Sequence, residues 1–332
     1  KMGNGSLASI REVAKLAGVS PATVSRVMNG TANVNEEKKK RVEAAIKETG
    51  FQPNELARAL YKKSSTMIGM IVPDIENPFF SELAKAVEDT AYQNGYRILL
   101  CSSGGDEEKE AVNIQMFNQL RADGIVVMTN CAETGKALED CPIPVVLVDR
   151  KLDGFNENAF IEADNYKGGY LAAEHLVQCG CKNIVCMKEP TGYSSGRRRY
   201  EGYLDVCKKY NLKEQSVDCR YNYESGLRAA EEILKKYPEV DGVVAGNDIV
   251  AMSVYKVFTR HGKKIPQEVQ LVGFDDVGFG ELFIPELTTI HQPIKEMGHL
   301  AAEIILKAVN GEPYEKKNVF DVKLIERETT KK

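Results

Sequence analysis

Residues 9–29, SIREVAKLAGVSPATVSRVMN, predict two short helices joined by a glycine turn. Ser9 is a preferred N-cap residue, and the apolar residues after it recur at the spacing of one helix face. Gly18 ends this helix, because glycine readily adopts the left-handed conformation of a helix C-terminus. Ser20 and Pro21 then supply an N-cap and a first helical residue, so a second helix begins there. The pattern is typical of a helix-turn-helix.

The second helix has a polar outer face that suits DNA. Small residues with hydroxyl, amide and guanidinium groups can enter the major groove and meet base edges and phosphates. The outer face consists of Pro21, Ala22, Thr23, Ser25, Arg26 and Asn29. A third helix is predicted from the cap residue Asn35 to Gly50, which completes a small helical domain over residues 9–50.

The distribution of charge separates the same part from the rest of the chain. Residues 1–63 contain 12 Lys and Arg against 6 Asp and Glu, a net charge of +6. The remaining 269 residues contain 32 against 42, a net charge of −10. Because affinity for phosphates comes from localised cationic charge, this distribution favours a nucleic-acid partner for the amino-terminal part alone.

The segment AGVSPATVSRVMNG, residues 17–30, resembles the DNA-binding signature of the lactose/galactose repressor (LacI/GalR) family. The resemblance implies a homodimer that binds double-stranded palindromic operator DNA, with Pro21, Ala22 and Arg26 reading bases. Further side chains would lie near phosphates: Ser20, Thr23, Ser25 and Asn29. The terminal IERETTKK has no leucine heptads, which favours a dimer over a tetramer.

Residues 51–65 are expected to form a hinge helix and a linker. The segment FQPNELARAL, residues 51–60, can form a short helix, but a helix of this length is marginal alone and needs a partner. In the family that the chain resembles, two such helices pack together in the minor groove, and Leu60 matches the apolar residue that wedges a base step apart. An ordinary interdomain linker is the alternative interpretation.

From Met67 onward, strand-like apolar runs alternate with amphipathic segments, which predicts an α/β fold with parallel sheets. The length of residues 66–332 fits two doubly wound subdomains, roughly 66–164 plus 293–320 and 165–292 plus 321–332. The predicted strands are MIGMIV (67–72), YRILLC (96–101), GIVVM (124–128), PVVLVD (144–149), NIVCM (183–187), GVVAGND (242–248) and VQLVGFD (269–275).

Polar and aromatic side chains collect just after these runs, where ligands bind in sheets of this kind. Carboxylates, guanidinium groups and amides can hydrogen-bond the hydroxyls of a polyol, and aromatic rings can cover its apolar face. The expected cap residue of the helix after GVVAG is Asp248. Phe79 and Phe80 open an amphipathic helix, so either one alone would more often belong to the core.

Residues 67–332 resemble the periplasmic sugar-binding fold of these repressors, and NPFF, VDR, GND and GFD look most like its ribose-binding members. Arg199 is preferred over Arg197 because RYEGY matches the spacing of the family's arginine. The resemblance implies that a small sugar, ribose or a related furanose, is held by Asn77, Phe79, Phe80, Asp149, Arg150, Arg199, Tyr221, Asn247, Asp275 and Gln292. A purine or hexose effector and an extracytoplasmic sugar-binding receptor are the alternatives.

Several other classes of protein are less consistent with the sequence. Residues 192–196, GYSSG, fit the GxSxG pattern of a hydrolase, but Pro190 interrupts the strand that a nucleophile elbow needs. The four histidines and eight cysteines show no metal-ligand spacing, so we expect no metal, no cofactor and reduced thiols. No apolar run approaches about 20 residues, and no secretory signal precedes the first helix, so we expect a cytoplasmic regulator without catalytic residues.

Overall fold

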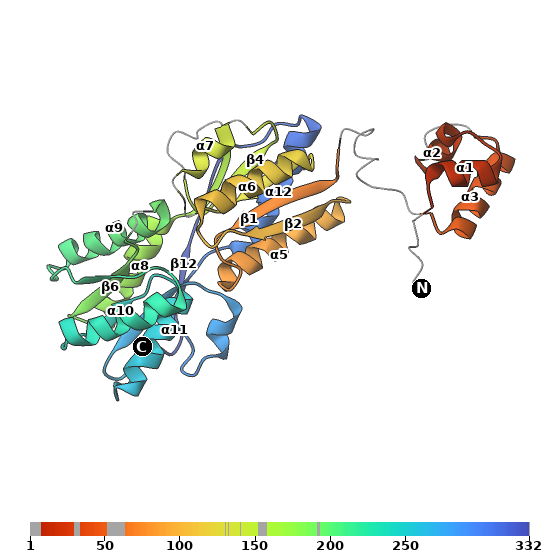
Figure 1. Ribbon diagram of the computed structural model, residues 1–332. Helices are drawn as coiled ribbons and strands as arrows, with labels where there is room; N and C mark the ends of the chain where they lie inside the picture. Colours follow the sequence, from red (N-terminus) through yellow and green to blue (C-terminus); the bar gives the residue numbers. More distant parts are fainter. Residues whose placement is uncertain are drawn as a thin grey trace. The chain divides into compact units, whose positions relative to one another are not determined.

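The structure is a computed structural model that describes residues 8–29, 34–51, 64–129, 131, 133–139, 141–151, 158–190 and 193–331. The chain divides into two compact units, Lys1–Ser65 and Thr66–Lys332, here called the headpiece and the body (Figure 1). Leu60 and most of the predicted hinge helix lie outside the described residues. None of the described helices combines the length and the apolar composition that crossing a membrane requires.

The headpiece contains the predicted three helices, α1 (Ile10–Ala17), α2 (Pro21–Asn29) and α3 (Glu36–Thr49). Ser9 caps α1 through a reciprocal capping box with Glu12, and Gly18 ends it at φ 64°. The Ser20 hydroxyl accepts from the backbone N–H of Thr23, as an N-cap should. The predicted caps are therefore confirmed. The helices enclose a small core of Val13, Ala14, Ala17, Val24, Val42 and Ala45.

The body is built on two sheets of the doubly wound type, one in each of two lobes. The first lobe has strand order β11-β5-β4-β3-β1-β2. These strands are β1 (Met67–Val72), β2 (Arg97–Ser102), β3 (Gly124–Val127), β4 (Val145–Val148), β5 (Ala159–Ala163) and β11 (Lys317–Phe320). The second lobe has strand order β12-β10-β9-β8-β6-β7. Its strands are β6 (Ile184–Lys188), β7 (Ser216–Asp218), β8 (Gly242–Val244), β9 (Gln270–Asp275), β10 (Thr289–His291) and β12 (Lys323–Ile325).

Neighbouring strands pair in parallel, with Ile68 of β1 opposite Gly124 of β3, whereas β12 pairs antiparallel with β10. The central strands β3 and β4 are buried along their whole length, because helices cover both faces of each sheet. The first sheet carries α5 (Pro78–Gln93) and α12 (Ile294–Asn310) on one face, and α6 (Glu107–Gln119) and α7 (Thr134–Glu139) on the other. This arrangement confirms the predicted α/β fold.

The second sheet is covered by α8 (Asn165–Gln178) and α9 (Ser194–Lys209) on one face, and by α10 (Tyr223–Lys236) and α11 (Asp248–Arg260) on the other. Two glycines let α8 and α9 pack backbone to backbone. A Cβ atom added at Gly169 would lie 1.9 Å from the carbonyl oxygen of Arg199, and one at Gly202 would lie 2.2 Å from that of Tyr166. This close packing fixes the position of Arg199 beside Asn165.

Candidate functional site

A cavity of about 320 Å³ lies at the carboxyl ends of the strands of both lobes. Its lining combines the segments after β1, β2 and β4 of the first lobe with those after β6, β7, β8 and β9 of the second. The structure brings together nine of the ten residues predicted to bind a small molecule: Asn77, Phe79, Phe80, Asp149, Arg150, Arg199, Tyr221, Asn247 and Asp275. The tenth, Gln292, lies behind Asp275 and donates from Nε2 to its Oδ1 at 2.7 Å.

The start of α5 supplies the aromatic part of the pocket. Asn77 is the N-cap of this helix, and its Oδ1 accepts from the backbone N–H of Phe79 at 3.1 Å. The rings of Phe79 and Phe80 meet edge to face, with centroids 5.2 Å apart. Both side chains belong to the buried core as well as to the pocket lining. Phe79 and Phe80 are therefore core residues and pocket residues at the same time. Rings fixed in this way offer a preformed apolar surface to a ligand.

Asp149 and Arg150, which follow β4, hold unused hydrogen-bonding capacity. Among the described residues, Oδ1 of Asp149 and both Nε and Nη1 of Arg150 are buried without a hydrogen-bond partner. Nε of Arg150 lies 3.4 Å from Oδ2 of Asp149, and its guanidinium stacks on the ring of Tyr193 at 4.0 Å. Buried polar groups in proteins are almost always paired with protein, water or ligand, so these atoms are positioned to hydrogen-bond a molecule in the cavity.

Arg199 is held in place by several groups of the second lobe. Its Nε donates to Oδ1 of Asn165 at 2.8 Å and its Nη1 to the carbonyl oxygen of Gly246 at 2.6 Å. The guanidinium also lies 3.6 Å from the ring centroid of Phe274. Arg197, the alternative in sequence, is largely exposed and lies near Glu201, outside the pocket lining. The structure thus places Arg199, and not Arg197, at the pocket.

Asp275 is the buried carboxylate of the second lobe. Its Oδ1 lies 3.9 Å from Nη2 of Arg199, and the backbone adopts a φ of 111°, which is rare for a residue with a side chain. Burial raises the pKa of Asp275 well above its ordinary value; Arg199 opposes this shift and the charge of Asp248 adds to it. Ligand hydroxyls that donate hydrogen bonds to this carboxylate would stabilise its ionised form.

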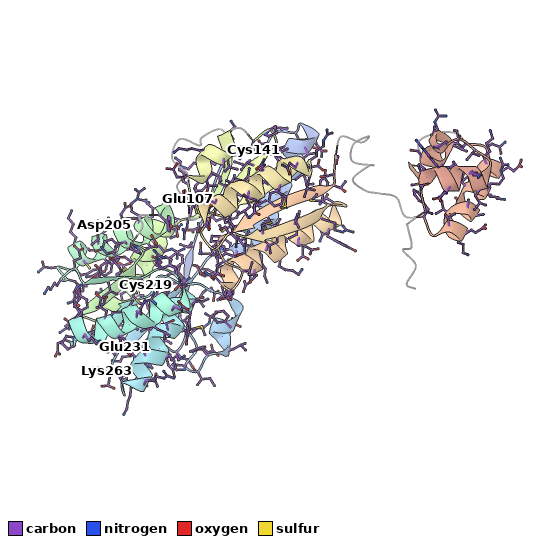
Figure 2. The ribbon with its side chains drawn as sticks, viewed as in Figure 1. Glu107, Cys141, Asp205, Cys219, Glu231 and Lys263 are labelled. Atoms are coloured by element: carbon purple, nitrogen blue, oxygen red, sulfur yellow. The ribbon has the colours of Figure 1, made fainter. Side chains whose placement is uncertain are left out.

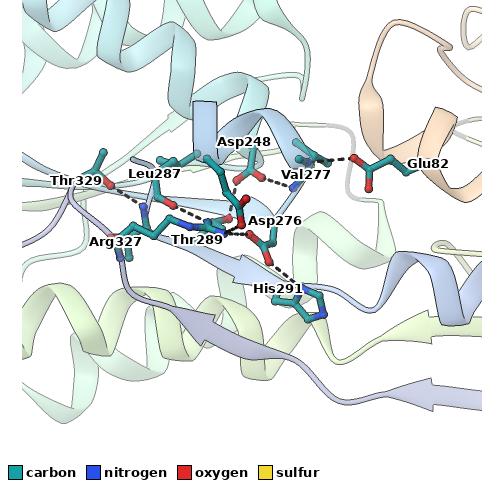
Figure 3. Close-up of polar contacts among 12 residues, drawn as sticks. Glu82, Asp248, Asp276, Val277, Leu287, Thr289, His291, Arg327 and Thr329 are labelled. Atoms are coloured by element: carbon teal, nitrogen blue, oxygen red, sulfur yellow. Dashed lines mark hydrogen bonds and ion pairs between the residues drawn. The ribbon is translucent and has the colours of Figure 1, made fainter. Parts of the chain in front are cut away.

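The expected cap at the start of α11 was wrong by one residue. Asn247 is the N-cap, and its Oδ1 accepts from the backbone N–H of Val250 at 2.9 Å, while its Nδ2 donates to the carbonyl oxygen of Tyr221. Asp248 is already the first helical residue, so its side chain turns inward and is fully buried. There it accepts from the Val277 N–H at 2.9 Å and from the Thr289 hydroxyl at 2.6 Å (Figure 3).

Sequence reasoning missed part of the lining, including Asp74, Glu189, Tyr193, Arg220 and Asn222. Glu189 directly follows β6, so the rule that selected the other residues applied to it as well. Arg220 and Asn222 follow β7, which has three residues and therefore gives no detectable strand pattern. Cys219, labelled in Figure 2, marks the segment after β7 from which they reach the pocket.

In the headpiece, α2 presents the predicted outer face. Pro21, Ala22 and Arg26 are exposed, and Thr23 and Ser25 are half-buried. The hydroxyl of Ser20 also lies 3.0 Å from that of Thr23. The side chain of Asn29 and the whole of Leu60 are outside the described residues. An exposed guanidinium between small side chains can approach a base edge closely.

The GxSxG pattern does not assemble a hydrolase site in the part of the chain that is described. Ser194 begins α9, six residues after the end of β6, and its hydroxyl accepts from the Lys151 N–H at 3.0 Å. The three histidines downstream are engaged elsewhere, with His261 at Glu231, His291 at Asp276 and His299 at Thr90. None of these contacts involves Ser194 or Ser195.

Comparison with known proteins identifies the family. Residues 65–331 match the family described as "Periplasmic binding proteins and sugar binding domain of LacI family", and residues 9–54 match "Bacterial regulatory proteins, lacI family". The chain belongs to the LacI family. This LacI-family chain is 38% identical to the ribose operon repressor of Halalkalibacterium halodurans over 98% of each sequence.

Two solved structures with bound sugars resemble the body of this LacI-family chain. A LacI transcriptional regulator from Alkaliphilus metalliredigens, complexed with D-xylulofuranose, is 34% identical with a TM-score of 0.74, covering 80% of this chain and 100% of that one. A LacI-family regulator from Enterococcus faecium with bound ribose is 28% identical with a TM-score of 0.71, covering 80% and 98%.

Proposed function

We propose that this chain is a transcription repressor, and not an enzyme, whose affinity for a palindromic operator is controlled by ribose or a closely related furanose. In this proposal residues 9–50 bind DNA, residues 51–65 form the hinge, and residues 66–332 bind the effector and dimerise. Such a regulator acts in the cytoplasm, next to the DNA. The ten predicted pocket residues and the outer face of α2, with Leu60, are the proposed contacts.

The observation that carries the effector proposal is the set of unpaired buried groups in the pocket. Asp149 and Arg150 supply these groups from the first lobe, and Arg199 and Asp275 face the same cavity from the second. A carboxylate needs a donor and a guanidinium needs an acceptor, and each hydroxyl of a sugar is both. A compact polyol can therefore satisfy both lobes at once, with one face against Phe79 and Phe80.

The charges around the pocket support a neutral sugar over a sugar phosphate. The described lining contains the carboxylates Asp74, Asp149, Glu189 and Asp275. It contains the guanidinium groups Arg150, Arg199 and Arg220. Because burial raises the pKa of Asp275, three guanidinium groups face three or four negative charges. An added phosphate would therefore meet no excess of positive charge, which favours an uncharged ligand. The related regulators with bound ribose and D-xylulofuranose support the same class of ligand.

The test is calorimetry of the full chain with D-ribose, D-xylulose, ribose 5-phosphate, galactose and hypoxanthine. We expect ribose or xylulose to bind at one site per chain, and ribose 5-phosphate to bind more weakly. A ligand at 100 times its Kd should also add about 2.7 kcal/mol to the free energy of unfolding. Binding of hypoxanthine or galactose without any pentose would contradict the furanose proposal.

A further inference from the structure

A polar network lies behind the pocket, around the turn of residues 275–278 that follows β9 (Figure 3). Asp275 of this turn lines the pocket, and Gly278 begins the short 3-10 helix η1 (Gly278–Leu282). Asp248 holds the middle of the turn, because its carboxylate accepts from the Val277 N–H and from the Thr289 hydroxyl of β10. Gly273 leaves space for this carboxylate: an added Cβ would lie 2.3 Å from its Oδ1.

Asp276 ties the other side of the turn to the same lobe. Its Oδ1 accepts from Nη2 of Arg327 at 2.7 Å, and its Oδ2 lies 2.9 Å from Nδ1 of His291. Arg327 in turn donates from Nη1 to the carbonyl oxygen of Leu287 at 2.9 Å. These contacts on both sides hold the turn, with Asp275, against the second sheet.

The far end of the turn reaches the other lobe. The backbone N–H of Gly278 donates to Oε1 of Glu82 at 3.1 Å, and Glu82 lies on α5, which packs on the first sheet. The two residues are 196 positions apart in sequence. Asp275 and Gly278 are three residues apart, so one rigid turn touches both the pocket and the opposite lobe.

The arrangement that contains this contact is the one that a ligand completes. Oδ1 of Asp149 and Nε and Nη1 of Arg150 line the pocket from the first lobe, buried and without a hydrogen-bond partner among the described residues, and Asp275 lines it from the second lobe. Leaving such groups unpaired and away from water is unfavourable, so lobes in this position are stabilised by a ligand that pairs them. The hydrogen bond between Glu82 and Gly278 stabilises the same arrangement of the two lobes.

We propose that Glu82 and the backbone N–H of Gly278 form an interlobe latch that holds the two lobes closed over the effector. The latch couples binding of a ligand at Asp275 to the position of α5. Asp248 and Asp276 position the turn that contains Asp275 and Gly278. This inference rests on the proposed function, because the effector is the ligand that closes the lobes. Glu82 and Gly278 are positioning residues outside the pocket lining.

Gly278 permits a test that removes the backbone N–H donor and leaves the side chains of all other residues unchanged. Gly278→Pro lacks the N–H, and Val277 at φ −74° and ψ 147° has the extended backbone that a following proline requires. Position 278 is the first residue of η1, where proline is tolerated. Gly278→Ala keeps the N–H and is the matched control, because its Cβ would have only Oε1 of Glu82, at 3.9 Å, within 4 Å. Glu82→Ala removes the acceptor, and Glu82→Gln retains an oxygen there.

The measurement is the Kd of D-ribose for the full chain and these variants by calorimetry. A hydrogen bond to a charged group contributes about 1.5–3 kcal/mol, and less when partly exposed, so we expect Gly278→Pro and Glu82→Ala to weaken ribose binding about three- to tenfold. Gly278→Ala should stay within about twofold of the unchanged chain, and Glu82→Gln, which keeps an acceptor but loses the charge, should lose less affinity than Glu82→Ala. The double variant Glu82→Ala/Gly278→Pro should be no weaker than the weaker single variant. Wild-type affinity in Gly278→Pro, or losses that multiply in the double variant, would overturn the latch.

The same variants separate this inference from the proposed function. If the unchanged chain does not bind ribose, the proposed effector is wrong, and the latch is then judged by urea unfolding of the four chains in the double-mutant cycle. Effects on the free energy of unfolding that fail to add would support a contact between the two positions. Strictly additive effects would refute it.

Discussion

Arg150 offers the sharpest test of the effector pocket, because its guanidinium faces the cavity with two nitrogens available for hydrogen bonds. Nε and Nη1 are buried and have no hydrogen-bond partner among the described residues. We expect Arg150→Met to fold normally and to lose ribose binding. Two hydrogen bonds from a charged group contribute about 1.5–3 kcal/mol each, so the loss should be about 3–6 kcal/mol, or a rise in Kd of about 10²- to 10⁴-fold.

The control for this prediction is Arg197→Met, which removes an exposed guanidinium outside the pocket lining. Calorimetry with D-ribose should give the affinity of the unchanged chain for Arg197→Met and little or no heat for Arg150→Met. Urea unfolding should place Arg197→Met within about 0.5 kcal/mol of the unchanged chain, in the range of ordinary surface substitutions. Arg150→Met leaves Asp149 without its nearby cation, so it should be less stable but should still unfold in a single cooperative transition. Ribose binding by Arg150→Met within tenfold of the unchanged chain would refute the reasoning about unpaired groups.

Three further predictions concern the headpiece, the hinge and the buried carboxylates. Arg26→Ala should weaken specific DNA binding by about 1–3 kcal/mol and relax the preference at one base pair, measured by fluorescence anisotropy; an equal loss on random DNA would mean that Arg26 contacts only phosphate. Leu60→Ser should lower operator affinity and leave the calorimetric Kd of ribose unchanged, and operator affinity equal to that of the unchanged chain would exclude the wedge role. Burial raises the pKa of Asp248 to about 7, from an ordinary value of about 3.9. Between pH 5 and 7, Asp248 therefore holds a proton in the folded chain that it has lost in the unfolded chain. The free energy of unfolding should therefore fall as pH rises through this range, by about 1–2 kcal/mol more in the unchanged chain than in Asp248→Asn; parallel curves in urea unfolding would contradict the shift.

Local signals predicted most of the architecture. Ser9, Gly18, Ser20 and Asn35 were recognisable because a helix end depends on one or two neighbouring residues, and the structure confirms these caps. The long central strands were also recognisable, because strands buried on both faces are continuously apolar. The strands β5, β7, β10, β11 and β12 did not appear among the predicted runs. Of these, β7, β11 and β12 lie at sheet edges and β10 has three residues, so they carry no such pattern, whereas the interior strand β5 contains Glu162, which interrupts its apolar run.

The position just after a recognised strand predicted some of the pocket residues, and the family resemblance predicted others, such as Arg199 on α9. Asp149 and Asp275 satisfied this rule, whereas Arg220 follows the undetected β7. Asp248 was wrongly predicted as the cap of α11, whereas Asn247 caps the helix and also lines the pocket as predicted. Sequence shows that a cap is present but not which of two adjacent polar residues turns inward. The contact between Glu82 and Gly278 depends on how two lobes close, and no local pattern carries that information.

The most direct measurement of the central claim is the affinity of the chain for its operator with and without ribose. Palindromic duplexes selected from a random library by the chain itself can be titrated by fluorescence anisotropy across a salt series. We predict that saturating ribose changes the Kd for the selected duplex at least tenfold, that the duplex changes the Kd for ribose by the same factor, and that Arg150→Met abolishes both effects. The sign of the change then distinguishes an inducer from a corepressor. A chain that selects no duplex, or a Kd for DNA that ribose leaves unchanged, would contradict the account.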